Sequence, residues 1–234
     1  MESVPLKRTQ SQILVNDFIR SVYNWMGIGL AVTGLVAFYV AQSPGAQRLI
    51  FGNQLIFFGL IIAELALVVS ISARIQRMQA STATGLFVVY SVLNGLTLSF
   101  IFLVYTHSSI FSVFFICAAT FGACSIYGMA TRRDLTSLGG FMAMGLIGIV
   151  IASLVNLFIR SSAVSMIVSY IGVFVFVGLT AYDTQMLKRM ALSQPEGIEA
   201  GVIRKGAILG ALKLYLDFIN LFLMLLRIFG TARD

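Results

Sequence analysis

Three acidic side chains stand inside long apolar stretches of the sequence, where ionisable groups are rare. Glu64 lies in the second stretch and Asp183 and Asp217 in the last two, and together they are three of the nine acids. A charged group near the centre of a bilayer costs about 2.5–3.5 kcal/mol on insertion scales, so such groups tend to face an interior or a water path. These carboxyls are therefore the first candidates for chemistry.

Asp183 and Asp217, the aspartate pair, could share a proton. Two carboxylates in one poorly hydrated site cannot both ionise cheaply, so a proton can be held between them. A neutral or singly charged pair hydrogen-bonds, whereas a fully ionised pair repels or binds a cation. Measured from the cytoplasmic ends of their helices, the two depths differ by about 5 Å, which two side chains can bridge. The sequence thus predicts a proton-sensitive pair that is also the candidate metal contact.

Both aspartates belong to polar stripes at helical spacing, which we expect to face a common interior. The sixth stretch carries Ser165, Ser169, Gly172, Thr180 and Asp183, and the seventh carries Lys213, Asp217, Asn220, Met224 and Arg227. Lys213 is the only intramembrane base, because Arg227 lies at the outer end of its predicted span. An alternative is that Asp217 pairs with Lys213, one turn away, as a neutralised structural contact.

The remaining candidates for an ion pathway are secondary: Glu64, Lys213, Asn220, Arg74 and Arg77. Glu64 is surrounded by aliphatic residues, and both a functional role and a protonated, hydrogen-bonded structural role stay open. Arg74 and Arg77 end the second stretch on the side of Asp183. They are expected as membrane anchors, with a contact to Asp183 as the alternative.

The amino-acid composition indicates which class of protein holds these residues. Of 234 residues, 59% are hydrophobic and only 11% charged, with a mean hydropathy of +0.95, which excludes a soluble domain. The net charge of +7 comes from bases placed singly or in pairs between apolar stretches, so no nucleic-acid partner is expected. With one histidine, His107, and no nucleophile motif, the chain is predicted not to be an enzyme and to need no cofactor.

We predict an all-α integral membrane protein. Seven stretches are long enough to cross a hydrocarbon core, and in lipid they must be helices because open strands leave backbone groups unpaired. They form one membrane domain, 22–234, behind a polar head, 1–21. The predicted spans are 22–42, 54–72, 84–105, 111–130, 139–159, 163–187 and 206–229. Glycine pairs at Gly206 and Gly210, and at Gly148 with Ala152, predict close helix contacts.

The basic residues set the orientation. Eleven lie in the head and in alternate loops, against four on the other side, so the head is predicted to be cytoplasmic. The eleven are Lys7, Arg8, Arg20, Arg74, Arg77, Arg132, Arg133, Lys188, Arg189, Arg204 and Lys205. Seven spans then place the C-terminus outside, whereas a re-entrant seventh segment would place it inside.

Three segments resemble the signature segments of the Bax inhibitor family, also called the transmembrane Bax-inhibitor-motif family. They are residues 131–135 (TRRDL), 176–184 (FVGLTAYDT) and 214–222 (LYLDFINLF). The chain looks most like the bacterial members of gamma-proteobacterial type, which implies an inner-membrane location and a periplasmic C-terminus. The resemblance also implies a bundle with a central seventh helix and a pH-sensitive calcium leak gated by Asp183 and Asp217, with calcium and protons as the ligands. A gating arginine would be Arg74 or Arg77.

Two other functions are weighed against the leak. Other bacterial members of this family have been linked to a membrane-bound AAA protease, which would make the chain a modulator of a protease partner. Tyr182-Asp183 and Asp217 also resemble the two-aspartate layout of intramembrane aspartyl proteases. However, Asp217 follows Leu-Tyr-Leu where those enzymes have Gly-x-Gly, and every proline lies outside the predicted spans. The aspartyl protease is therefore the remote alternative.

Overall fold

The structure, a computed structural model, describes residues 3–193 and 199–233. Within that part, helices form every element, and the only β pairing is the isolated bridge between Tyr105 and Ala232. Among the described residues, seven helices are long and apolar enough to cross a membrane: Val15–Ala41, Gln54–Arg77, Ala80–Val104, His107–Ala130, Thr136–Ile159, Ser162–Leu192 and Ala200–Phe229. The predicted all-α seven-span membrane protein is confirmed.

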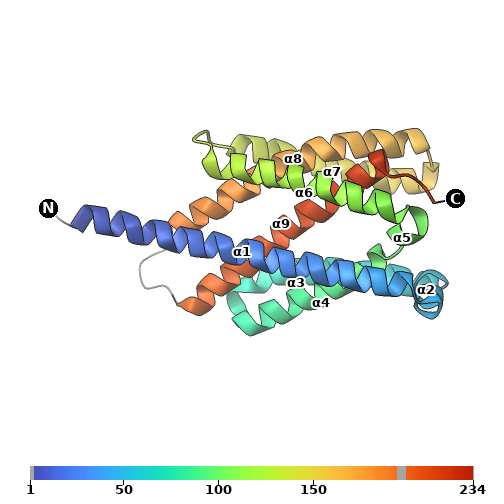
Figure 1. Cartoon of the computed structure of the whole chain (residues 1–234), viewed down its shortest axis with the longest axis horizontal. Coiled ribbons are helices and arrows are strands. Elements are labelled where there is room, and N and C mark those ends of the chain that lie inside the picture. The colour runs from blue at the N-terminus through green and yellow to red at the C-terminus, as the bar shows by residue number, and fades with distance from the viewer. Residues whose placement is uncertain (1–2, 194–198, 234) are drawn as a thin grey trace. The chain divides into compact units, whose positions relative to one another are not determined.

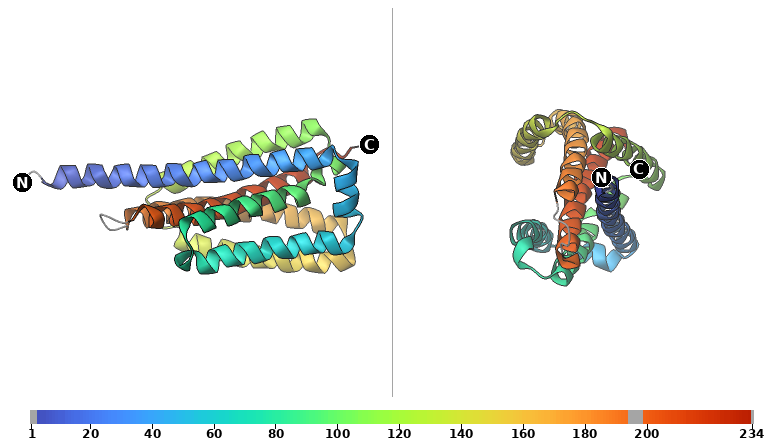
Figure 2. Two further views of the ribbon diagram at one scale, coloured as in Figure 1. Left: turned by 90° about the horizontal axis from the view of Figure 1, so that it is seen from below. Right: turned by 90° about the vertical axis from the view of Figure 1, so that its left-hand side faces the viewer.

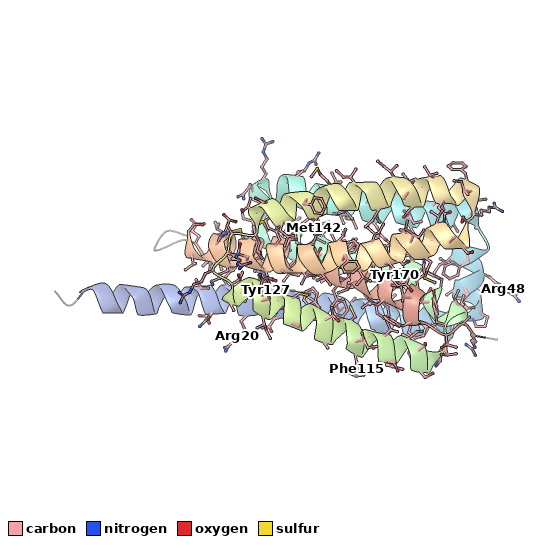
Figure 3. The ribbon with its side chains drawn as sticks, turned by 90° about the horizontal axis from the view of Figure 1, so that it is seen from above. Arg20, Arg48, Phe115, Tyr127, Met142 and Tyr170 are labelled. Carbon is pink, nitrogen blue, oxygen red and sulfur yellow. The ribbon has the colours of Figure 1, made fainter. Side chains whose placement is uncertain are left out.

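Contacts divide the chain into two compact units, and the first comprises Met1–Val104 and Arg189–Tyr215. Its elements are α1 (Ser3–Ala41), α2 (Pro44–Phe51), α3 (Gln54–Arg74), η1 (Ile75–Arg77), α4 (Ala80–Leu98), α5 (Ile101–Val104) and the first half of α9 (Ala200–Phe229). Helix α4 packs against both α1 and α3. Helix α1 extends at its N-terminal end well beyond α3 and α4 (Figure 2). Arg20 on α1 and Arg48 on α2 lie far apart along the first unit (Figure 3).

The second unit comprises Tyr105–Lys188 and Leu216–Asp234. It contains α6 (His107–Ala130), α7 (Thr136–Ile159), most of α8 (Ser162–Leu192) and the second half of α9. Helices α6, α7 and α8 lie side by side in Figure 1. The C-terminal tail is held to the start of α6, because the Thr106 amide donates to the Thr231 carbonyl and the Thr231 amide donates to Ser109 Oγ.

Burial separates helices suited to face lipid from helices suited to pack inside protein. Only 6% of the most apolar window of α3, and equally of α7, is buried, and both helices expose large apolar side chains such as Leu55 and Phe158. The corresponding window of α9 is 67% buried, the largest share of the seven. Such burial is expected of a helix surrounded by others, whereas exposed apolar surface in α3 and α7 suits hydrocarbon.

Several helix boundaries differ from those predicted. Helix α1 begins at Ser3, so the part of the polar head that the structure describes is helical; the side chains of Lys7 and Arg8 lie outside the described residues. The loop with Arg48 forms α2, which Ser43 caps and which is too short to span. The third span breaks after Leu98 into α4 and α5. Helix α9 is continuous over 30 residues, which does not support a re-entrant seventh segment.

Close helix contacts occur at glycines, but not always at the predicted ones. A Cβ on Gly206 would lie 3.3 Å from the Phe18 ring, which confirms that contact. The prediction at Gly148 is wrong, because a Cβ there would meet nothing within 4 Å. Helices α1 and α4 also come close together at Gly95, where a Cβ would lie 2.8 Å from both the Thr33 carbonyl and Val36 Cβ.

We expect Gly95→Ala to lower the free energy of unfolding by about 1–3 kcal/mol, because the added methyl group meets the backbone of α1. Gly85→Ala on the same helix is the control. A Cβ at Gly85 meets nothing, so this variant should be neutral or more stable by about 1 kcal/mol through helix propensity. Unfolding in mixed micelles with increasing denaturing detergent measures both. Equal stabilities of the two variants would show that the Gly95 contact is not tight.

Candidate functional site

Helix α8 buries Asp183 in the second unit. The aspartate is 8% exposed, and the flanking Thr180 and Thr184 are fully buried. The Thr180 hydroxyl donates to the Phe176 carbonyl of its own helix, so it is satisfied without another element. Gly172 and Ser169, earlier in the same stripe, are also buried. The polar stripe of α8 therefore lies inside protein.

Two glycines bring α6 and α7 against α8 at the two residues before Asp183. Gly128 of α6 lies directly on the Ala181 carbonyl, where no Cβ would fit. Gly139 of α7 lies under the Tyr182 ring, which a Cβ would approach to 2.5 Å. Farther along α7, Met142 fills the space in front of Gly178 (Figure 3). Close packing of α6 and α7 at these glycines thus fixes the position of the segment of α8 that carries Asp183.

Two side chains just beyond Asp183 hold the connection between α6 and α7. Gln185 accepts from the Leu135 amide at 2.9 Å and donates to the Arg133 carbonyl at 2.7 Å. Lys188 donates to the Met129 carbonyl at 2.6 Å and so caps the end of α6. Sequence analysis missed Gln185 altogether and used Lys188 only as an orientation signal. Nothing in the sequence marks a glutamine that bonds residues 50 positions away.

Helix α9 buries Asp217 in the same unit. The residue is 5% exposed, and its Oδ2 atom is inaccessible to solvent. The adjacent Phe218 packs edge-on against Phe114 and Phe121 of α6, with ring centroids 5.6 and 5.4 Å away. The Cys117 thiol of α6 lies 3.7 Å from the Phe218 carbonyl. The residue next to Asp217 is thus packed among the aromatic rings of α6.

A contact between α8 and α9 sets the relative depth of the aspartate pair. A Cβ on Gly172 would lie 2.8 Å from Met224 Cγ, so the two helices are close at that level. Adjacent spans joined by a short connection run in opposite directions. At 1.5 Å per residue, Asp183 lies about 16 Å beyond Gly172 along α8, and Asp217 lies about 10 Å before Met224 along α9. Because the two helices run in opposite directions, both aspartates lie on the same side of the contact. The pair is therefore offset by about 6 Å, close to the depth difference expected from the sequence.

The secondary candidates are distributed over both units. Asn220 is half-buried and donates to the Leu216 carbonyl of its own helix. Lys213 is half-buried one turn before Asp217 on α9. Arg74 and Arg77 end α3 and η1 and are exposed; they belong to the first unit and Asp183 to the second, so a contact between them stays a prediction.

Glu64 takes part in a hydrogen-bonded network within the first unit. Its Oε1 accepts from the Thr97 hydroxyl at 2.8 Å and its Oε2 from the Asn94 amide at 3.3 Å. Asn94 Oδ1 accepts from the Tyr215 hydroxyl at 3.0 Å, and that hydroxyl lies 2.6 Å from the hydroxyl of Thr33. Tyr215 and Thr33, which complete the network, were not among the predicted site residues.

The aspartate pair alone offers few ligands for a metal ion. Among the described residues, no group of three or more His, Cys, Asp or Glu side chains is placed to hold one. Calcium takes six to eight oxygen ligands, so a calcium ion at two carboxylates would need carbonyl or water oxygens as well.

Comparison with known proteins identifies the family to which this chain belongs. The family model described as "Inhibitor of apoptosis-promoting Bax1" matches residues 15–234. The inner membrane protein YbhL of Escherichia coli is 55% identical over 219 residues, covering 94% of this chain and 93% of its own. A protein of Borreliella burgdorferi is 42% identical over 99% of both chains, and a membrane protein of Streptococcus pyogenes is 41% identical over 95% of this chain and 96% of its own. The seven-span chain belongs to the Bax inhibitor family of membrane proteins.

Proposed function

We propose that this protein is a passive calcium leak of the bacterial inner membrane, opened and closed by protons on the aspartate pair. The observation that carries the proposal is the burial of Asp183 and Asp217 in one unit, on two helices in contact, at depths about 6 Å apart. Intramembrane carboxyls are costly and tend to lie on ion or proton pathways.

The chemistry of the gate follows from the charge of the pair. With one proton between them, two carboxyls attract and hold α8 and α9 together. When that proton leaves, the two negative charges repel each other unless a cation lies between them. Loss of the proton therefore separates the helices and creates a site for a divalent cation in the same step. Alkaline conditions should open the leak and acidic conditions should close it.

The direction of regulation depends on the orientation of the chain. The distribution of Lys and Arg predicts a cytoplasmic N-terminus and, after seven spans, a periplasmic C-terminus. Asp183 is five residues from Lys188, at the end of α8 that this orientation places towards the cytoplasm. The pair would then respond mainly to cytoplasmic pH.

Replacing either aspartate by asparagine should abolish the pH dependence of calcium flux. An asparagine side chain keeps its size and can hydrogen-bond, but it cannot lose a proton between acid and alkaline pH. Calcium entry into proteoliposomes, measured after a step from acid to alkaline pH, should rise severalfold for the wild type. The rates of Asp183→Asn and Asp217→Asn should be the same on both sides of the step.

Thr180→Val is the matched control for this experiment. It removes a buried polar group one turn from Asp183 whose hydrogen bond lies within its own helix, so the pH response should be retained. Wild-type pH dependence in both asparagine variants would eliminate the aspartate pair as the gate. Equal rates with sodium or magnesium in place of calcium would contradict calcium selectivity.

A compensating pair of substitutions tests the register of α8 and α9. Gly172→Leu should weaken the pH response of the flux, because its side chain collides with Met224 and forces the two helices apart. Adding Met224→Ala makes room for that side chain and should restore the response. Gly148→Leu, at a glycine with open space around it, should leave the response unchanged. If Met224→Ala gave no rescue, the helix contact would not control the pair.

A further inference from the structure

A hydrogen-bond chain in the first unit runs from α3 to α1 through α4 and α9. It begins at Glu64 Oε2, 3.3 Å from the Asn94 amide nitrogen, and continues from Asn94 Oδ1 to the Tyr215 hydroxyl at 3.0 Å. The Tyr215 hydroxyl lies 2.6 Å from the Thr33 hydroxyl, which lies 2.9 Å from the Ser91 carbonyl. All its members except Glu64 are at least nine-tenths buried, so water does not supply missing partners.

Counting protons shows that this chain is incomplete when Glu64 is ionised. The chain has four contacts in a row, and each needs one hydrogen. Asn94 contributes one hydrogen towards Glu64, while the hydroxyls of Tyr215 and Thr33 contribute one each. The Tyr215 hydrogen points to Asn94, so the single Thr33 hydrogen must serve either Tyr215 or the Ser91 carbonyl. One of these contacts then has two oxygen atoms facing each other with no hydrogen between them.

A proton on Glu64 completes the chain if the Asn94 amide turns over. The Glu64 O–H then donates to Asn94 Oδ1, the Asn94 amide donates to Tyr215, Tyr215 donates to Thr33, and Thr33 donates to the Ser91 carbonyl. Four hydrogens serve four contacts. The heavy atoms need not move, because the oxygen and nitrogen of an amide are nearly the same size. The Thr97 hydroxyl continues to donate to the other carboxyl oxygen.

We infer that Glu64 is a second proton-binding site of this protein, and that its proton sets the direction of the hydrogen-bond chain through Asn94, Tyr215 and Thr33. This site lies in the first unit and is distinct from the aspartate pair in the second. It goes beyond the proposed calcium leak and stands whether or not the protein conducts calcium.

No charged group competes with the chain for Glu64. The titratable side chains that face the carboxyl are the phenols of Tyr90 on α4 and Tyr215 on α9. Its hydrogen-bond partners are the neutral Thr97 and Asn94, and within the described part of the chain no Lys, Arg or His forms an ion pair with it. The carboxyl therefore has no fixed positive charge to favour ionisation, and the proton count decides between its two states.

Infrared spectroscopy of the full-length protein in lipid nanodiscs tests the inference directly. The wild type at neutral pH should show a carboxylic-acid C=O band that is missing from the spectrum of Glu64→Gln. Tyr215→Phe should shift the frequency of that band, because it removes one member of the chain and keeps the ring packing. Tyr90→Phe is the matched control. The centroid of the Tyr90 ring lies 5.5 Å from that of the Tyr215 ring, but the Tyr90 hydroxyl is not part of the hydrogen-bond chain. The C=O band should therefore not move in this variant.

Superimposable wild-type and Glu64→Gln spectra in the C=O region would overturn the inference, because Glu64 would then be ionised at neutral pH. An unshifted band in Tyr215→Phe would overturn the chain. Bands from the aspartate pair do not interfere, because they remain in the spectrum of Glu64→Gln.

Thermal unfolding against pH gives a second test, which does not require the tyrosine variant to fold. Glutamine donates N–H where protonated glutamate donates O–H, so Glu64→Gln keeps four hydrogens at every pH. The wild type loses one as pH rises through the ionisation of Glu64, and its Tm should therefore fall relative to that of Glu64→Gln in alkaline solution. A constant Tm difference from acid to alkaline pH would contradict the proton count.

Discussion

Hydrocarbon offers no hydrogen-bond partner, and this constraint explains where the polar residues of the chain lie. Each buried polar side chain must be satisfied by its own helix or by another one. Thr180 and Asn220 take the first route and bond a carbonyl one turn earlier. Glu64 and Tyr215 take the second and thereby tie helices together. Hydrogen bonds between helices therefore help to determine which helices pack against each other.

Helix α9 carries two buried polar residues, Tyr215 and Asp217, that belong to different units. Tyr215 and Asp217 are two residues apart, so they project about 200° apart around the helix axis and within about 3 Å of the same depth. Tyr215 bonds partners from α1 and α4 in the first unit, whereas Asp217 lies in the second unit beside the aromatic rings of α6. A single turn of α9 therefore carries a polar group of each unit.

Much of this could be predicted from the sequence because apolar context makes a buried carboxyl conspicuous. Asp183, Asp217 and Glu64 were found by that criterion, and the seven spans by length and composition. Tyr215, Asn94 and Thr33 could not be found, because tyrosine, asparagine and threonine are common in spans and their contacts join residues up to 182 positions apart. Gly128 was missed because it acts singly against α8, without a small residue at the spacing of a glycine pair, and Gly139 was missed although Ala143 stands at that spacing.

The two proposed proton sites would respond to protons through different physics. In the proposed gate, the proton on the aspartate pair would remove a repulsion between two charges, so its loss would push the helices apart. In the Glu64 chain the proton supplies a missing hydrogen, so its loss leaves neutral oxygens facing each other and weakens a tie among helices that are already packed. The first effect can open a path, whereas the second adjusts how firmly α9 is held by α1, α3 and α4. Helix contacts at Gly95 in the first unit and at Gly172 in the second hold the helices that carry these groups close together, and both proposed responses depend on that packing.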